Sequence, residues 1–303
     1  MKLQFHTLDV FTGRPFGGNP LAVVLGADAL STAQMQAITR EFNLSETTFV
    51  MAPEDPANTA RVRIFYPGGE MPFAGHPTVG TAILLAALKQ KAQCNFETEL
   101  RLELNAGLTP VKDTRIADRA VAKLVAPRLP SLAPGDVPPL AHVARALDLD
   151  PRDIGFPGHQ LALTRGAIGF LTVPVASRDV LKRVRIIEPH WSAIVGQVAD
   201  LDAAYVYAKG GDDPATHYRA RMFAPTGGIP EDPATGSATV QMAAVLLAAE
   251  ALKDGRHAWR FEQGYEMGRP SDLFLEADVA AGALTQVRLA GQAVQIMSGV
   301  LEL

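Results

Sequence analysis

The chain has 303 residues, a length that favours two domains. Hydrophobic residues make up 48% and charged residues 20%, and lysine plus arginine against aspartate plus glutamate gives 28 − 32 = −4, without any basic block. A nucleic-acid-binding protein normally carries a positive patch, so we expect no nucleic-acid partner. Apolar stretches such as residues 243–249 fall far short of the roughly 20 residues that a membrane span needs, so we expect no membrane partner and a cytoplasmic location.

The single cysteine, Cys94, excludes intramolecular disulfides, Cys-x-x-Cys redox pairs and cysteine-built zinc sites. The seven histidines are scattered, and no two have the i, i+4 spacing of a helical metal site. The glycine-rich fingerprints of nicotinamide, flavin and nucleotide binding are also missing from the sequence. We therefore expect chemistry by side chains alone, with no cofactor and no metal.

The N-terminal part of the chain predicts strands around one helix. Ser31 fits an N-cap and Gln34, three residues later, completes a capping box, so a helix begins here and ends near Asn43. β-Branched and aromatic residues favour strands on both sides of this helix. The expected strands are residues 3–10, 21–25, 47–51 and 61–66.

Two strongly apolar segments, residues 78–89 and 235–250, predict helices that are buried on several sides. Five prolines in residues 127–139 predict a loop between the two halves, with the domain boundary at or somewhat before it. We therefore expect two domains, each with a sheet around one central helix. The other expected elements are helices at residues 140–147, 177–184 and 189–198, and strands at residues 169–173, 203–208, 218–223, 273–276, 287–289 and 293–297.

One pattern occurs in both halves of the sequence. The matches are RVRIFYPGG at 61–69 with RARMFAPTGG at 219–228, and HPTVGTA at 76–82 with DPATGSA at 232–238. The downstream pair aligns at an offset of 156 (232 − 76) and the upstream pair at 158 (219 − 61), so we expect the intervening turns to differ in length. The pattern predicts two copies of one fold, with His76 equivalent to Asp232.

In each copy a strand and a glycine-containing turn lead to the start of a buried helix. The first turn of a helix leaves four N–H groups without partners and carries partial positive charge, so it suits an anion, here a carboxylate. If the domains face each other, both helix starts meet one ligand, with His76 beside one start and Asp232 beside the other. The expected substrate-binding groups are the backbones of Gly80 and Gly236 and the hydroxyls of Thr81 and Ser237.

Each candidate residue also has a purely structural interpretation. Asp232 precedes Pro233 and fits an ordinary helix N-cap, and His76 alone fits a hydrogen-bonded turn residue. Glu46, in the segment NLSETTFV, is either a solvated loop charge or a buried general base. Burial would raise the pKa of its carboxyl toward neutrality, which suits proton transfer. Without further context, the residues favour the solvated loop charge for Glu46.

Together these segments resemble the phenazine biosynthesis PhzF-like family, which shares its fold with diaminopimelate epimerase. The matching segments begin with GNPLAV at Gly18, NLSETTF at Asn43, RVRIFYP at Arg61, PFAGHPTVGTA at Pro72, RMFAPTGGIPEDPATGSA at Arg221 and QGYEMGRPS at Gln263. The resemblance implies an α+β fold of two pseudo-symmetric domains, each a mixed sheet wrapped around a central helix. It also implies a homodimer and a cofactor-independent isomerase, with the active site between the domains.

The resemblance also implies roles for individual residues. It makes Glu46 the general acid/base, while His76 and Asp232 assist proton transfer and substrate binding. Ser237 and the adjoining turn amides then hold the substrate carboxylate. The other residues that we expect to bind substrate are Gly75, Gly80, Thr81, Gly236 and Asn19. The known reaction of the family isomerises trans-2,3-dihydro-3-hydroxyanthranilate.

Relatives in the epimerase branch carry a catalytic cysteine in each glycine turn, whereas Cys94 lies in neither turn here. A carboxylate that shifts a proton within a conjugated system is therefore favoured over thiol-based racemisation. The alternative is a non-catalytic small-molecule-binding or interaction protein that retains the fold, which a solvent-directed Glu46 would favour.

The expected domains are residues 1–118, joined by the strand at 293–303, and residues 119–292.

Overall fold

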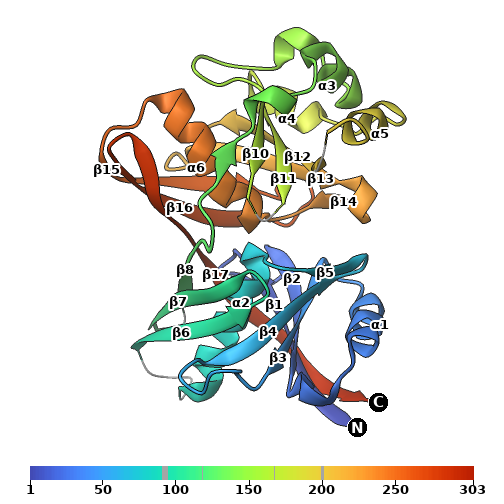
Figure 1. Cartoon of the computed structure of the whole chain (residues 1–303), viewed down its shortest axis with the longest axis vertical. Coiled ribbons are helices and arrows are strands. Elements are labelled where there is room, and N and C mark those ends of the chain that lie inside the picture. The colour runs from blue at the N-terminus through green and yellow to red at the C-terminus, as the bar shows by residue number, and fades with distance from the viewer. Residues whose placement is uncertain (91–94, 118, 167, 199–200) are drawn as a thin grey trace. The chain divides into compact units, whose positions relative to one another are not determined.

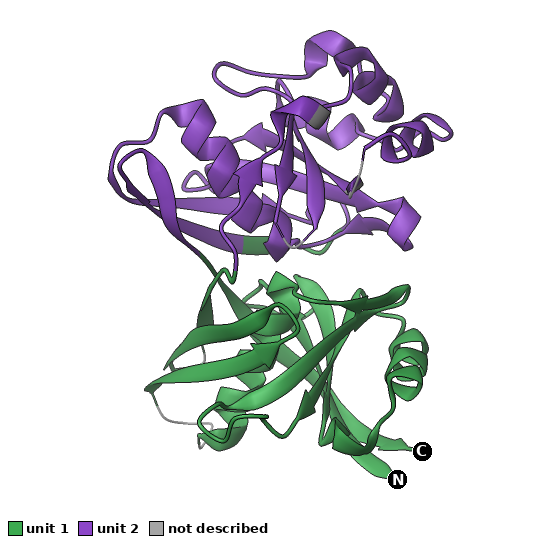
Figure 2. Ribbon diagram, viewed as in Figure 1, with its two compact units in different colours: residues 1–127, 268–272, 288–303 green, residues 128–267, 273–287 purple. Residues whose placement is uncertain are grey.

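The computed structural model describes residues 1–90, 95–117, 119–166, 168–198 and 201–303, so Cys94 lies outside the described residues. Two compact units make up the chain (Figure 2). Unit 1 is Met1–Pro127, Gly268–Asp272 and Arg288–Leu303, and unit 2 is Arg128–Met267 and Leu273–Val287. The first boundary follows Pro127 rather than residue 118, because β8 (Arg119–Val125) pairs with strands of unit 1 on both sides.

Unit 1 wraps a mixed sheet around α2 (Gly75–Lys89), which is apolar almost all round and contacts strands on several sides (Figure 1). Its second helix, α1 (Thr32–Phe42), begins at the expected capping box: the Ser31 hydroxyl accepts from the Gln34 N–H, and the Gln34 side chain accepts from the Ser31 N–H. The strands are β1 (Lys2–Val10), β2 (Asn19–Leu25), β3 (Glu46–Met51), β4 (Ala60–Tyr66), β5 (Gly69–Met71), β6 (Phe96–Leu104), β7 (Gly107–Ile116), β8 and the C-terminal part of β17 (Ala283–Glu302).

Unit 2 is built around a second apolar helix, α6 (Gly236–Glu250). The proline-rich segment expected to be a loop also contains the short strand β9 (Ser131–Leu132) and a 3-10 turn at Pro134–Asp136. The other helices of unit 2 are α3 (Leu140–Ala146), α4 (Arg178–Arg183) and α5 (His190–Val195). The other strands are β10 (Ala162–Arg165), β11 (Gly169–Pro174), β12 (Leu201–Lys209), β13 (Tyr218–Ala224), β14 (Ile229–Asp232), β15 (Gly255–Gln263), most of β16 (Ser271–Ala280) and the start of β17.

The two units pair their strands in the same order. In unit 1, β1 and β2 are antiparallel, β2 and β3 parallel, β3 and β4 antiparallel, and β4 pairs with β5 antiparallel and with β6 parallel. In unit 2, β10 to β15 repeat this series of pairings and directions. The expected α+β fold of two pseudo-symmetric domains is therefore confirmed.

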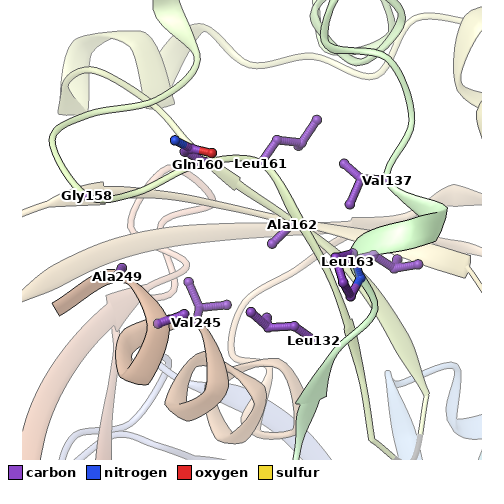
Figure 3. Close-up of a pocket in the computed structure, with 11 residues that line it drawn as sticks. Leu132, Val137, Gly158, Gln160, Leu161, Ala162, Leu163, Val245 and Ala249 are labelled. Atoms are coloured by element: carbon purple, nitrogen blue, oxygen red, sulfur yellow. The ribbon is translucent and has the colours of Figure 1, made fainter. Parts of the chain in front are cut away.

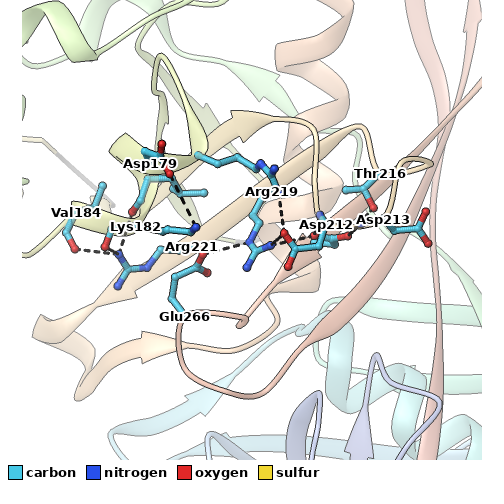
Figure 4. A network of polar contacts seen from close by, with 12 residues as sticks. Asp179, Lys182, Val184, Asp212, Asp213, Thr216, Arg219, Arg221 and Glu266 are labelled. Carbon is cyan, nitrogen blue, oxygen red and sulfur yellow. Dashed lines mark hydrogen bonds and ion pairs between the residues drawn. The ribbon is translucent and has the colours of Figure 1, made fainter.

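A side-chain network in unit 2 holds the loop between β12 and β13 (Figure 4). The buried carboxylate of Glu262 accepts from the N–H groups of Asp212 (2.8 Å) and Asp213 (2.9 Å) and from the hydroxyl of Thr216 (2.9 Å). The guanidinium of Arg219 lies 3.3 Å from the same carboxylate and 2.9 Å from that of Asp212. The loop therefore closes around one buried acidic side chain.

Unit 1 contains the same network at a more exposed position. The carboxylate of Glu103 accepts from the N–H groups of Glu54 (2.7 Å) and Asp55 (2.9 Å) and from the amide of Asn58 (2.7 Å). The sequences EDPAN from residue 54 and DDPAT from residue 212 align at the offset of 158 (212 − 54) found for the adjoining strands. The internal repeat thus extends further toward the N-terminus than the sequence analysis recognised.

We predict that Glu262→Ala lowers the free energy of unfolding by about 3 kcal/mol, because three donors and a buried arginine lose their shared acceptor. Glu103→Ala is the matched control: it removes the equivalent contacts, but water can replace them, so its effect is smaller. Urea denaturation of both variants measures the difference. Equal losses of stability would show that burial of the network does not matter.

Candidate active site

Glu46 and His76 lie together where β3 begins and α2 begins. Glu46 is the first residue of β3 and pairs with Leu21 of β2, so strand pairing fixes its backbone. His76 is in the first turn of α2. Glu46 is 7% exposed and His76 3% exposed, and Glu46 Oε2 is 3.2 Å from His76 Nε2. The structure therefore supports the interpretation of Glu46 as a buried carboxylate and not as a solvated loop charge.

The imidazole of His76 is uncharged at neutral pH. Burial lowers its pKa to about 3 because desolvation disfavours the charged ring, although a hydrogen bond to the backbone of Pro20 acts in the opposite direction. Asn19, the first residue of β2, places its Nδ2 3.3 Å from His76 Nδ1. Each ring nitrogen therefore has a polar neighbour, Asn19 at Nδ1 and Glu46 at Nε2. A neutral His76 presents Glu46 with a dipole rather than with a cation.

The starts of α2 and α6 leave N–H groups available for a ligand. The N-cap residue of α2 is Ala74, which has no polar side chain, and Gly75 follows it. The N-cap residue of α6 is Thr235, whose side chain makes no capping hydrogen bond, and Gly236 follows it. Uncapped helix starts favour anions through their N–H groups and dipole. The geometry at both helices is therefore compatible with carboxylate binding.

Asp232 is held just before α6 by its neighbours. It is the last residue of β14 and is buried, and its Oδ2 accepts from the Thr235 hydroxyl at 2.5 Å. The fully buried Gln263 donates to the Asp232 carbonyl (2.8 Å) and to the Thr235 hydroxyl (2.9 Å), and accepts from the Thr235 N–H (3.0 Å). Asp232 is therefore not the N-cap residue of α6, a position that Thr235 occupies.

The expected equivalence of His76 with Asp232 is wrong. Asp232 pairs with Met222 in unit 2 as Met71 pairs with Ile64 in unit 1, so Asp232 corresponds to Met71. This equivalence has an offset of 161 (232 − 71), which differs from the 156 of the motif alignment.

The hydrogen bonds of the two helix starts give the same offset. Thr78 Oγ1 donates to the Ala74 carbonyl at 2.7 Å, and Thr239 Oγ1 donates to the Thr235 carbonyl at 3.0 Å, an offset of 161 (239 − 78). At this offset His76 corresponds to Ser237. The turn before β14 contains the 3-10 turn Pro225–Gly227 and raises the offset from 158 to 160 (229 − 69), and a register shift between β13 and β14 raises it to 161.

Two expected substrate-binding residues lie further along α2 and face the sheet. A Cβ on Gly80 would come within 2.6 Å of the Leu21 side chain and 2.7 Å of the Val10 side chain. The fully buried Thr81 places its hydroxyl 2.9 Å from that of Thr48 in β3. Both residues therefore pack α2 onto the strands, and we withdraw their assignment to the substrate.

Gln263 and Arg269 bond residues in or beside the candidate site, and the sequence analysis did not single them out. Both lie in the segment QGYEMGRPS, which was used only for the family resemblance. Arg269 contacts Asp9 and the backbone directly before Asn19. Gln263 ends β15, whose sequence GRHAWRFEQ is strongly polar, so no local pattern distinguished this residue.

A cavity of about 520 Å³ in unit 2 lies elsewhere (Figure 3). Its lining is mostly apolar and includes Leu132, Val137, Leu161, Val245 and Ala249. The candidate residues above do not line it. In the described ranges, no group of three histidine, cysteine or acidic residues is placed to hold a metal ion, and no helix is long and apolar enough to span a membrane.

The sequence model of a family described as "Phenazine biosynthesis-like protein" matches residues 8–299. An uncharacterized isomerase of Mesorhizobium japonicum is 40% identical over 97% of this chain and 96% of its own length. Trans-2,3-dihydro-3-hydroxyanthranilate isomerase of Pseudomonas aeruginosa is 33% identical over 98% of both chains. The crystal structure of a PhzF-family phenazine biosynthesis protein from Bacillus anthracis is 24% identical, covers both chains fully and has a TM-score of 0.87, which shows the same fold. The chain therefore belongs to the PhzF family of phenazine biosynthesis-like proteins and is an isomerase.

Proposed function

We propose that the protein moves a proton on a small carboxylate-bearing substrate by acid/base catalysis, without a metal or nucleotide cofactor. The proposed reaction is of the trans-2,3-dihydro-3-hydroxyanthranilate isomerase type. The observation that carries it is the buried pair of Glu46 and His76, with 3.2 Å between Oε2 and Nε2, at the uncapped start of α2. The relative that is 33% identical has this activity in its name, which supports the substrate class.

Glu46 is the proposed acid/base. Its carboxylate takes a proton from one carbon of the substrate: the C–H bond breaks, an O–H bond forms, and the electron pair moves along the conjugated system. The same O–H bond then breaks as the proton is delivered to a second carbon. Substrate and product have the same composition, so the cycle needs no oxidant or reductant. The neutral imidazole of His76 orients the carboxyl group throughout.

The substrate carboxylate is assigned to backbone N–H groups and nearby polar side chains. In unit 1 these are the start of α2 at Gly75 and the amide of Asn19, and in unit 2 the start of α6 at Gly236 with the Ser237 hydroxyl. We propose that Asp232 acts on the same substrate. Its fixed geometry, set by Thr235 and Gln263, suits a group that contacts a ligand.

A non-catalytic binding protein with this fold is the second hypothesis. It would gain support from a Glu46 side chain directed to solvent. Glu46 is instead buried beside His76, and the named relatives are isomerases. These observations favour catalysis.

The test is turnover of trans-2,3-dihydro-3-hydroxyanthranilate in deuterated water. We expect the wild-type protein to form isomerised product that carries solvent deuterium. Glu46→Gln keeps the shape but removes the acid/base function, so we expect kcat to fall roughly 100-fold or more with little change in KM. Glu41→Gln, an exposed glutamate of α1, is the control and should retain wild-type kinetics.

Two outcomes would contradict this proposal. If the wild-type protein gives neither product nor deuterium incorporation, this compound is not the substrate, and related cyclic or α-amino carboxylates are tested next. If Glu46→Gln turns over at the full wild-type rate, proton transfer belongs to Asp232 or His76 instead.

His76 makes a specific contribution to the pH dependence of stability. Its pKa is about 3 in the folded protein and near 6.5 when unfolded, so the unfolded state holds the extra proton between these values. Stability therefore decreases as the pH falls below 6.5. We expect the wild-type protein to lose about 2 kcal/mol more than His76→Gln between pH 7 and pH 5. Urea denaturation at pH 7 and pH 5 measures this difference in the free energy of unfolding. His142→Gln, at an exposed histidine, is the control and should keep the pH dependence of the wild-type protein. Equal losses of stability in the wild-type protein and in His76→Gln would contradict the prediction.

Ser237 and Thr81 separate ligand binding from packing. Ser237→Ala removes one of several donors to the substrate carboxylate, so KM should rise about 3- to 10-fold while kcat stays within about twofold. Thr81→Ala removes a hydroxyl already engaged with Thr48, so KM should not change while the protein becomes less stable. Steady-state kinetics and thermal denaturation of both variants test the assignment. A raised KM for Thr81→Ala with none for Ser237→Ala would reverse it.

A further inference from the structure

A short segment, Gly268–Asp272, belongs to unit 1 although the chain on both sides of it belongs to unit 2. Arg269 in this segment makes three charge-assisted hydrogen bonds within unit 1. Its guanidinium donates to the carbonyls of Gly17 (2.7 Å) and Gly18 (2.8 Å) and to Asp9 Oδ1 (2.5 Å). The segment also bonds through its backbone, because the Pro270 carbonyl accepts from the Gly18 N–H at 3.0 Å.

These contacts hold the loop between β1 and β2 in a costly conformation. Phe11 and Phe16 both have left-handed backbones, with φ of 64° and 67°, which costs a residue other than glycine about 1 kcal/mol or more. Asp9 Oδ2 accepts from the Phe16 N–H at 2.7 Å, so the carboxylate that binds Arg269 also fixes the tip of the loop. Gly18 has φ of 64°, and a Cβ there would lie 2.2 Å from the Val10 carbonyl. Such a loop conformation needs stabilising contacts from outside the loop, which Arg269 and Pro270 provide.

This loop between β1 and β2 ends directly at the candidate active site. Asn19 follows Gly18, is fully buried and lies 3.3 Å from one ring nitrogen of His76. The Pro20 backbone also hydrogen-bonds the ring. The other ring nitrogen lies 3.2 Å from Glu46. The Arg269 contacts at Gly18 are therefore directly adjacent in the chain to Asn19 and Pro20, which contact the His76 ring.

We propose that Arg269 is a positioning residue for the proton-transfer site: its guanidinium fixes the β1–β2 loop so that Asn19 and Pro20 hold the His76 ring toward Glu46. Three acceptors around one planar group explain why an arginine is needed, since lysine offers a single point charge. The kinetic consequence rests on the proposed function, whereas the effect on the His76 ring does not.

The test combines NMR of the histidine rings with chemical rescue. Imidazole ¹⁵N spectra of the wild-type protein should show His76 neutral from about pH 8 down to pH 5. In Arg269→Ala the ring loses its fixed partners and gains water, so we expect its signals to shift and to titrate within this range. Methylguanidinium at about 20 mM should restore the wild-type signals, because the Arg269 side chain is 28% exposed and its site can be reached from solvent. Arg40→Ala, which also removes an arginine bonded to a carbonyl (Pro67), is the matched control and should leave His76 unchanged.

The kinetic measurement follows on the same variants. We expect Arg269→Ala to lower kcat at least about 10-fold with KM changed less, and methylguanidinium to recover most of the loss. Arg269→Lys keeps the positive charge but lacks the planar guanidinium with its several N–H donors, so it should have an intermediate effect on both kcat and the His76 signals. If Arg269→Ala does not fold, the lysine variant provides the test. A folded variant with wild-type His76 signals overturns the proposal whatever its activity. If the His76 signals shift as expected while the wild-type protein lacks isomerase activity, the positioning role stands and the proposed function fails.

Discussion

A carboxyl group and an uncharged imidazole share a buried position at the start of α2, and much of unit 1 is arranged to keep them there. A charged His76 would be costly in this buried position, because desolvation disfavours the charged ring. The structure meets this constraint with a neutral ring, whose pKa burial lowers to about 3, and with neighbours on both ring nitrogens. With the ring neutral, Glu46 is the member of this pair that we propose exchanges a proton with the substrate.

The duplicated fold supplies the scaffold, but the two copies have diverged in chemistry. Ala204 of β12 pairs with Phe223 of β13 in the same way that Thr47 of β3 pairs with Phe65 of β4. The residue before Ala204, Ala203, therefore occupies in unit 2 the position that Glu46 has in unit 1. Ser237 likewise occupies the position of His76. The networks around Glu103 and Glu262, by contrast, are nearly unchanged. Structural contacts were retained in both copies, while Glu46, the proposed acid/base group, has a counterpart without a carboxyl group in unit 2.

The errors of the sequence analysis have physical causes. A local match of prolines and glycines set the repeat at an offset of 156, whereas the strand pairing of Met71 and Asp232 sets it at 161. Pairing is a long-range property that a short motif does not encode. β6, β7 and β8 were not predicted, although FETELRLEL in β6 alternates polar and apolar residues with the period of a strand. Many charged residues on its exposed face obscured that signal.

The sequence by itself determined the family, the two-domain α+β fold and the two central helices, because these depend on local patterns and motifs. It also singled out Glu46, His76 and Asp232 as candidate site residues. Only the tertiary structure decided that Glu46 is buried beside His76, that Gly80 and Thr81 serve packing, and that Arg269 reaches back to the loop before Asn19. Burial and contacts between residues about 250 positions apart arise from how strands pair in three dimensions, and no local pattern specifies them.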